Sequence, residues 1–169
     1  ADSVVGDLHG ELFPVRLHGF DAAVERALEE IVDASADEPV AHAALQVIPP
    51  ERWGDLRLVP IRAARLLRVD HPVNDWLDAS RDERRLPPPA PSPRTVLISR
   101  LGYARHRREL EELEALLLAP LFRGATVAEA LDHALLDADD AAEEALMGSL
   151  AGWFERWFRD GLFAAVEEP

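Results

Sequence analysis

The strongest constraint on the fold is a series of helix and turn signals in the last 75 residues of the chain. Residues 126–129, Thr-Val-Ala-Glu, have the pattern of a capping box, in which the Thr and Glu side chains satisfy free N–H groups at a helix start. Gly124 precedes that helix, and Gly161 ends the next one, where a C′ residue favours glycine. These signals divide the segment into three helices framed by short strands.

The predicted order after residue 94 is strand, strand, helix, helix, helix, strand. The first two strands meet at a turn marked by Gly102. The first helix is expected to carry Glu109, Glu111 and Glu112 in its first turn, where the helix dipole favours acidic residues. The expected strands are 96–98, 103–107 and 162–166, and the expected helices are 109–118, 126–136 and one from residue 140 to 160. The apolar stripe of the third helix is Leu146, Leu150, Trp153, Phe154, Trp157 and Phe158.

Residues 1–80 give weaker and mixed signals. Apolar residues at helical spacing predict an amphipathic helix over 19–32, with Val32 on its apolar face. Residues 40–48 form a second short helix at best. Within 56–69 leucines alternate with arginines, which predicts two short strands interrupted near Pro60. Pro72 is expected to open a helix that runs through residue 77.

A proline-rich segment separates the two halves. Residues 81–94 contain charged residues followed by closely spaced prolines, a composition that favours an extended, semi-rigid spacer. Such segments also bind aromatic grooves, but prolines without a clean repeat fit a connector better. We therefore expect an α+β protein with a helical N-terminal segment and short strands over 1–80, a linker over 81–94, and a winged-helix-like (ββααα-β) recognition domain over 95–169.

The net charge of −14 is unevenly distributed along the chain. Residues 51–108 carry 13 Arg and 7 acidic residues, whereas residues 1–38 carry −8 and residues 109–169 carry −12. So acidic a protein repels nucleic acid at long range. All 18 basic residues are Arg, whose planar forks suit carboxylates. The positive band therefore either meets an acidic peptide or protein, or pairs with the chain's own acidic ends.

No common catalytic or metal-binding motif is present in the sequence. The chain has no Cys, which excludes disulfides and thiolate metal sites, and its six His lack the spacing of a zinc motif. Residues 148–152, Gly-Ser-Leu-Ala-Gly, resemble a nucleophile elbow only superficially, because the segment lies inside an expected helix. We therefore expect no enzyme activity, no cofactor and no metal in this chain; the alternative is an enzyme whose site has no recognised motif.

We expect neither a membrane span nor a signal peptide. The sequence has no run of 18 apolar residues, and its first ten residues are acidic where a signal peptide is basic and then apolar. We expect no membrane partner and a cytoplasmic protein.

Several of these segments together resemble a known group of proteins. Residues 114–117 (Glu-Ala-Leu-Leu), 124–130 (Gly-Ala-Thr-Val-Ala-Glu-Ala), Trp153 and 161–163 (Gly-Leu-Phe) resemble the winged-helix precursor-recognition domains of peptide-maturation systems. The resemblance extends upstream through 56–58 (Leu-Arg-Leu), 65–68 (Arg-Leu-Leu-Arg), Pro72, Val73, Trp76 and 95–100 (Thr-Val-Leu-Ile-Ser-Arg). Over about 20–164 the chain resembles the non-catalytic partner proteins of multinuclear non-haem iron-dependent oxidative enzymes, which modify ribosomally made peptides. Many such partners carry an additional N-terminal helical domain that has no counterpart here, which leaves the subfamily and the modified peptide open.

The resemblance implies a subunit that binds the leader of a precursor peptide and presents it to an iron-dependent enzyme in a hetero-oligomer, with the iron in that enzyme. The leader is expected to add a strand to a free sheet edge, in a groove between that edge and the third helix. Candidate peptide contacts are apolar residues and nearby arginines: Val96, Leu97, Ile98, Arg100, Arg105, Arg107, Met147, Leu150, Phe154 and Phe158. Core packing is the competing role for the apolar members. The expected enzyme-facing surface comprises Arg65, Arg68, Pro72, Val73 and Trp76.

A DNA-binding winged-helix regulator is the main alternative. Such a protein needs a basic recognition helix that reads base edges with Arg, Lys, Asn or Gln. The helix expected over 126–136 contains Glu129 and Asp132 but no Arg, and the third helix has Arg156 and Arg159 only near its end. We therefore expect no nucleic-acid partner.

Overall fold

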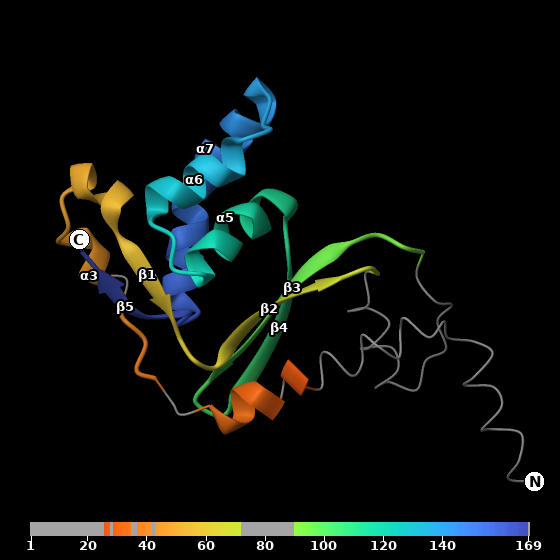
Figure 1. Ribbon diagram of the computed structural model, residues 1–169. Coiled ribbons are helices and arrows are strands. Elements are labelled where there is room, and N and C mark those ends of the chain that lie inside the picture. Colours follow the sequence, from red (N-terminus) through yellow and green to blue (C-terminus); the bar gives the residue numbers. More distant parts are fainter. Residues whose placement is uncertain (1–25, 28, 35–36, 42, 72–89, 169) are drawn as a thin grey trace, which may run out of the picture.

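The protein is a mixed α and β structure with short strands, as expected for the α+β class (Figure 1). The computed structural model describes residues 26–27, 29–34, 37–41, 43–71 and 90–168. Residues 26–27 and 29–33 are helical and confirm part of the helix predicted over 19–32. The helix predicted from Pro72 and residues 81–89 of the linker lie outside the described residues.

The elements after residue 94 follow the predicted order of two strands, three helices and one strand. The two strands predicted within 56–69 are also present, and they are separated after Pro60. The labelled elements are α3 (Ala43–Gln46), the 3₁₀ helix η1 (Pro50–Asp55), β1 (Arg57–Pro60), β2 (Ala64–Val69), β3 (Arg94–Leu101), β4 (Ala104–Leu110), α5 (Glu112–Phe122), α6 (Val127–Leu135), α7 (Asp140–Arg159) and β5 (Phe163–Glu167).

The predicted capping box is confirmed at the start of α6. The Thr126 side chain accepts a hydrogen bond from the Glu129 N–H at 3.2 Å, and the Glu129 carboxylate accepts one from the Thr126 N–H at 2.7 Å. The backbone hydrogen bond at Thr126 lowers the pKa of Glu129 below its usual value. Gly124 and Gly161 both have positive φ angles, 86° and 65°, which explains why glycine occupies these two turns.

Two details of the predicted helices are wrong. The helix α5 begins at Glu112, because Glu109 belongs to β4, where it lies opposite Val96 of β3. Strand pairing therefore decided the conformation of a segment whose acidic residues favour a helix start. Val32 was placed on the buried face of the first helix, but its side chain is 50% exposed.

Two antiparallel sheets organise the fold. One sheet has the strand order β2-β3-β4, and the other pairs β1 with β5. Strands from both sides of residues 72–89 therefore pair with one another, β2 with β3 and β1 with β5. The helix α5 contacts both β1 and β3, and in Figure 1 it lies between the two sheets.

The sheet β2-β3-β4 separates two hydrophobic clusters, because alternate residues of a strand point to opposite faces. Leu97 belongs to the larger cluster, which it shares with the buried face of α5 and with α7. Its neighbours Val96 and Ile98 belong to the smaller cluster, together with Ala27 and Ile31 of the first helix. Both faces of β3 are thus covered.

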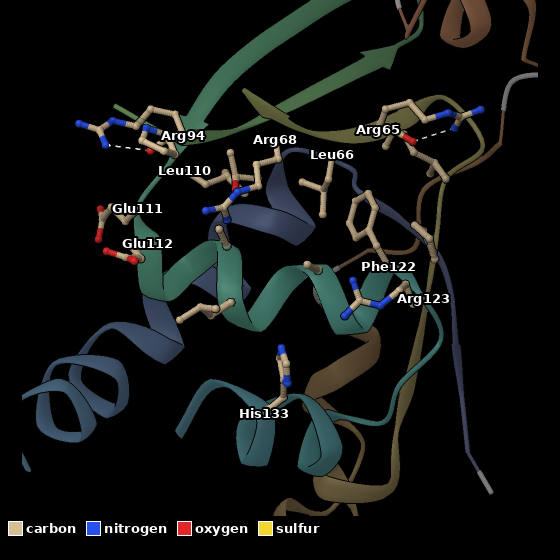
Figure 2. A pocket seen from close by; sticks show the side chains of 18 of the residues that line it. Arg65, Leu66, Arg68, Arg94, Leu110, Glu111, Glu112, Phe122, Arg123 and His133 are labelled. Carbon is tan, nitrogen blue, oxygen red and sulfur yellow. Dashed lines mark hydrogen bonds between the residues drawn. The ribbon is translucent and has the colours of Figure 1, made fainter. Parts of the chain in front are cut away.

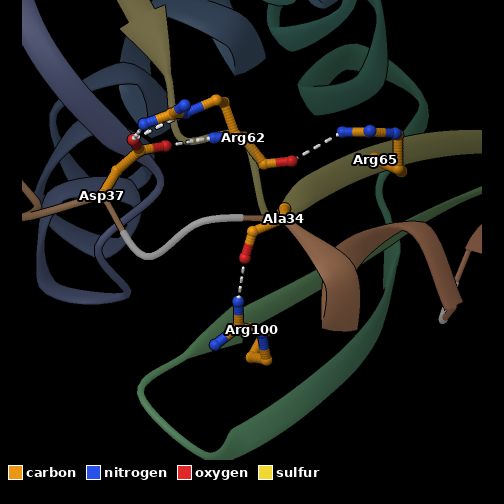
Figure 3. A network of polar contacts seen from close by, with 5 residues as sticks. All are labelled: Ala34, Asp37, Arg62, Arg65 and Arg100. Atoms are coloured by element: carbon orange, nitrogen blue, oxygen red, sulfur yellow. Dashed lines mark hydrogen bonds and ion pairs between the residues drawn. The ribbon is translucent and has the colours of Figure 1, made fainter.

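Arginines hold the end of the first helix against the smaller cluster (Figure 3). The Arg100 guanidinium donates to the carbonyl oxygens of Ile31 and Ala34 at 2.7 and 2.6 Å, which satisfies acceptors at the helix C-terminus. Arg62 makes a two-point contact with Asp37, with N···O distances of 2.9 and 2.7 Å. This contact lowers the pKa of Asp37 below its usual value and raises that of Arg62.

Glu114 of α5 is a fully buried carboxylate that ties three elements together. Arg108 of β4 donates two hydrogen bonds to it at 2.8 and 2.9 Å, and the Trp157 indole of α7 donates a third at 2.8 Å. The Arg156 guanidinium lies 3.0 Å from the same carboxylate. Burial alone raises the pKa of Glu114, but the hydrogen bonds from Arg108 and Trp157 and the charges of both arginines lower it below its usual value.

We expect Glu114→Gln to reduce the free energy of unfolding at pH 7 by about 3 kcal/mol, because it leaves two arginines facing a neutral group in the interior. Glu155→Gln, on the exposed side of α7, makes the same change in charge and is the control.

Because the pKa of Glu114 is lower in the folded protein, its contribution to the free energy of unfolding is complete above the unfolded pKa of about 4.5. This contribution is lost as the pH falls through the folded pKa. The difference between wild type and Glu114→Gln in urea unfolding should therefore shrink below about pH 4.5. A difference that does not change between pH 7 and pH 3 would contradict this role.

Candidate functional site

A groove with a cavity volume of about 1130 Å³ lies between strand β2 and helix α5 (Figure 2). Arg65, Leu66 and Arg68 line it from β2, and Phe122 lines it from α5. Ala115 and Ala119 of α5 also line the groove, and these small side chains leave space between the helix and the strand. The groove therefore has a strand as one wall and a helix as the other.

The strand wall of this groove is a sheet edge. In the described part of the chain, β2 pairs with β3 and with no strand on its other side. The Arg100 N–H donates to the Ala63 carbonyl at 2.9 Å, so residues 63 and 100 form a hydrogen-bonded pair. Pairs alternate along an antiparallel ladder, so the backbone groups of Ala64, Leu66 and Arg68 point outward, away from β3.

The Ala64 N–H already donates to the Ile61 carbonyl at 3.2 Å and the Ala64 carbonyl accepts from the Arg65 guanidinium at 2.8 Å, so Leu66 and Arg68 form the open part of the edge. Ala64, Leu66 and Arg68 also line the groove.

The groove carries more positive than negative charge. It is lined by five arginines and by two glutamates, Glu111 and Glu112, which lie together at the start of α5. This local excess contrasts with a chain whose net charge is −14. The five arginines are Arg62, Arg65, Arg68, Arg94 and Arg123.

Two of these arginines are engaged elsewhere. Arg62 pairs with Asp37 at 2.7 Å, and Arg65 pairs with Glu30 at 2.9 Å. Within the described ranges, no ion pair involves Arg68, Arg94 or Arg123. The positive band of the sequence is thus divided: part of it pairs with the chain's own acidic residues, and part of it faces this groove.

The strand residues predicted to bind peptide lie elsewhere. Val96, Leu97 and Ile98 are buried in β3, which pairs with β2 on one side and β4 on the other. The expectation that this strand contributes a free edge is wrong, because both of its hydrogen-bonding edges are occupied. The neighbouring strand β2 has the open edge instead.

The α7 residues predicted to bind peptide do not line the groove. Phe154 and Phe158 are buried in the larger cluster, and Leu150 is partly buried against it. Met147 is 57% exposed. The helix beside the groove is α5, the first of the three C-terminal helices and not the third.

The structure also separates the predicted arginines. Arg100 holds the carbonyl groups at the end of the first helix. Arg105 is exposed on β4, and Arg107 is partly buried on the same strand. Arg65 and Arg68, assigned from the sequence to the enzyme-facing surface, both line the groove. Pro72, Val73 and Trp76, assigned to the same surface, lie outside the described residues.

Sequence reasoning missed the groove residues of α5. The available signal was the spacing of Ala115 and Ala119, one helical turn apart and followed by Phe122, which places small residues on one face. A second signal was the pair of leucines flanked by Arg65 and Arg68, since charged flanks are common on edge strands.

No known family model matches the chain, and no curated protein matches its sequence. Across the described residues, no group of three His, Asp or Glu side chains is arranged to hold a metal ion. The described helices include none with the length and apolar character of a membrane span.

Hydrogen exchange tests whether the edge of β2 is open. In the free protein, the outward amides of Leu66 and Arg68 should exchange at least about tenfold faster than those of Arg65 and Leu67, which donate to β3. Amide exchange followed by NMR gives all four rates in one experiment, so the inward amides serve as the control. Equal protection of the two pairs would show that the outer edge of β2 is covered.

Proposed function

We propose that this protein is a non-catalytic subunit that binds the leader of a ribosomally made precursor peptide and presents it to an iron-dependent oxidative enzyme. The observation that supports this proposal best is the open edge of β2 beside the groove. An extended peptide pairs with such an edge through main-chain hydrogen bonds, and pockets for its alternate side chains add specificity.

The arrangement of the C-terminal elements is consistent with this role. We propose that β3, β4, α5, α6, α7 and β5 form a winged-helix-like recognition domain, with the element order and the capping box of α6 as support. Within this proposal β2, from the N-terminal half, completes the sheet and contributes the edge that the peptide extends.

The oxidation and the iron belong, in this proposal, to the partner enzyme. Holding the leader would raise the local concentration of the precursor at the enzyme's active site without any new chemistry in this chain. Pro72, Val73 and Trp76 remain the proposed enzyme-facing residues, close in sequence to the end of β2 at Val69.

A DNA-binding regulator is less consistent with the described helices. The helix α6 carries Glu129 and Asp132 and no Arg. Arg156 of α7 lies against the buried Glu114 and is therefore not directed at a base edge. Direct readout is made mainly by Arg, Lys, Asn and Gln side chains, and α6 contains none of these four residue types.

Co-expression tests the proposed assembly. The chain should co-purify with its cognate enzyme, and mass spectrometry should find the precursor modified only when both proteins are present. A chain that stays monomeric, binds neither enzyme nor precursor, and instead binds duplex DNA tightly at low salt would contradict the proposal and favour the regulator.

N-methylated leader peptides test the mode of binding. Methylation of every second amide removes the donors that face β2 in one register and the donors that face solvent in the other. One set should abolish binding measured by calorimetry and the other should retain it, with the unmethylated leader as the reference. Equal binding of both sets would exclude strand addition.

A further inference from the structure

The two walls of the groove have matching lengths. From Ala64 to Arg68 the strand β2 advances about 13 Å at roughly 3.3 Å per residue. From Ala115 to Arg123 the chain of α5 and its C-cap advances about 12 Å at roughly 1.5 Å per residue. An extended segment of five residues is therefore as long as the groove, and its main chain can pair with β2 at Leu66 and Arg68.

Each end of this window offers an arginine without an ion pair in the described part of the chain. Arg68 lies at the end of β2 that faces the start of α5. Arg123 follows Phe122 at the other end of the groove. Figure 2 shows the two guanidinium groups apart, Arg68 next to Leu66 on the strand and Arg123 below Phe122 at the end of α5.

Strand geometry fixes which peptide side chains reach these groups. Residues opposite each other in neighbouring strands place their side chains on the same face of the sheet. Ala64, Leu66 and Arg68 share one face of β2 because their positions differ by two. Peptide residues opposite these three therefore point into the groove, and the two intervening residues point to the other side of the sheet.

We infer that the groove selects extended peptides with an acidic side chain at each end of a five-residue window and an apolar side chain at its centre. The central side chain contacts Leu66, Phe122 and the small residues of α5. The outer carboxylates pair with Arg68 and Arg123, whose planar guanidinium groups can each donate two hydrogen bonds to one carboxylate. This inference rests on the proposed binding of a peptide strand and specifies the sequence class of that peptide.

The two glutamates that line the groove do not remove its preference for acidic peptide side chains. Glu111 and Glu112 both lie at the start of α5, where Arg94 also lines the groove. Arg68, on the opposite wall, belongs to the strand that the peptide pairs with, so it is the nearer charge to an added strand. The window is symmetrical about its apolar residue, so the selection holds for either direction of the peptide chain.

Two blocked peptides of the same composition test the inference. One has the sequence Ser-Glu-Thr-Leu-Thr-Glu-Ser, with both carboxylates on the face of the leucine. The other is Ser-Thr-Glu-Leu-Glu-Thr-Ser, which moves both carboxylates to the opposite face. Titration of the full, ¹⁵N-labelled chain should shift the amides of Leu66 and Arg68, and the first peptide should bind about tenfold more tightly at low salt.

Arginine variants locate the contacts. Arg68→Gln and Arg123→Gln should each weaken binding of the first peptide about fivefold and leave the second unchanged. Arg159→Gln, at the far end of α7 and exposed, is the matched control and should change neither. Circular dichroism melts of the three variants establish that each is folded.

The outcomes separate this inference from the proposed function. Equal affinity for the two peptides, or binding of neither, overturns the selection for acidic ends even if the cognate precursor binds to β2. Preference for the first peptide with no binding of the cognate precursor upholds the selectivity of the groove and overturns the assigned biological role.

Discussion

The buried carboxylate of Glu114 is the interaction on which the rest of the structure depends. Glu114 belongs to the first turn of α5, and its buried carboxylate accepts hydrogen bonds from Arg108 of β4 and Trp157 of α7. Burying a charged group costs free energy unless all its hydrogen-bond partners are in place. This contact therefore favours one relative placement of the β3-β4 hairpin, α5 and α7. Because α5 is also the helical wall of the groove, the width of the groove depends on the same contact.

The other wall depends on β3. This strand is covered on both faces and paired on both edges, so it fixes β2 at one side and β4 at the other. The sheet then ends at β2, whose outward backbone groups face the groove. The same three strands thus provide a buried central strand, β3, and an open edge strand, β2. In our proposal the peptide binds at the edge of β2.

Local signals in the sequence were sufficient for α6, α7 and the glycine turns beside them. Thr126, Glu129, Gly124 and Gly161 act within a few residues of themselves, and the elements they mark are present. The start of α5 was misplaced because pairing of β4 with β3 extends through Glu109 and Leu110, and pairing between strands is not encoded locally. The burial of Glu114 could not be predicted from local signals either, because its partners Arg108 and Trp157 lie 6 and 43 positions away in the chain.

The sequence contained enough information to predict which strand lies at the edge of the sheet. Three consecutive buried residues, Val96, Leu97 and Ile98, are typical of a central strand covered on both faces. Leu66 and Leu67, flanked by arginines, fit an edge better. What the sequence could not provide was the helix opposite that edge, because α7 carries the larger aromatic stripe and α5 is the helix that lines the groove.

Photo-crosslinking tests most directly whether the precursor lies along β2. A photoreactive amino acid in place of Arg68 or of Met147 compares the groove with the exposed side of α7, in the complex with enzyme and precursor. Binding at the edge of β2 requires that mass spectrometry identify precursor crosslinked at position 68 and not at position 147. Crosslinks at position 147 alone would place the peptide on α7 and contradict the assignment of the groove.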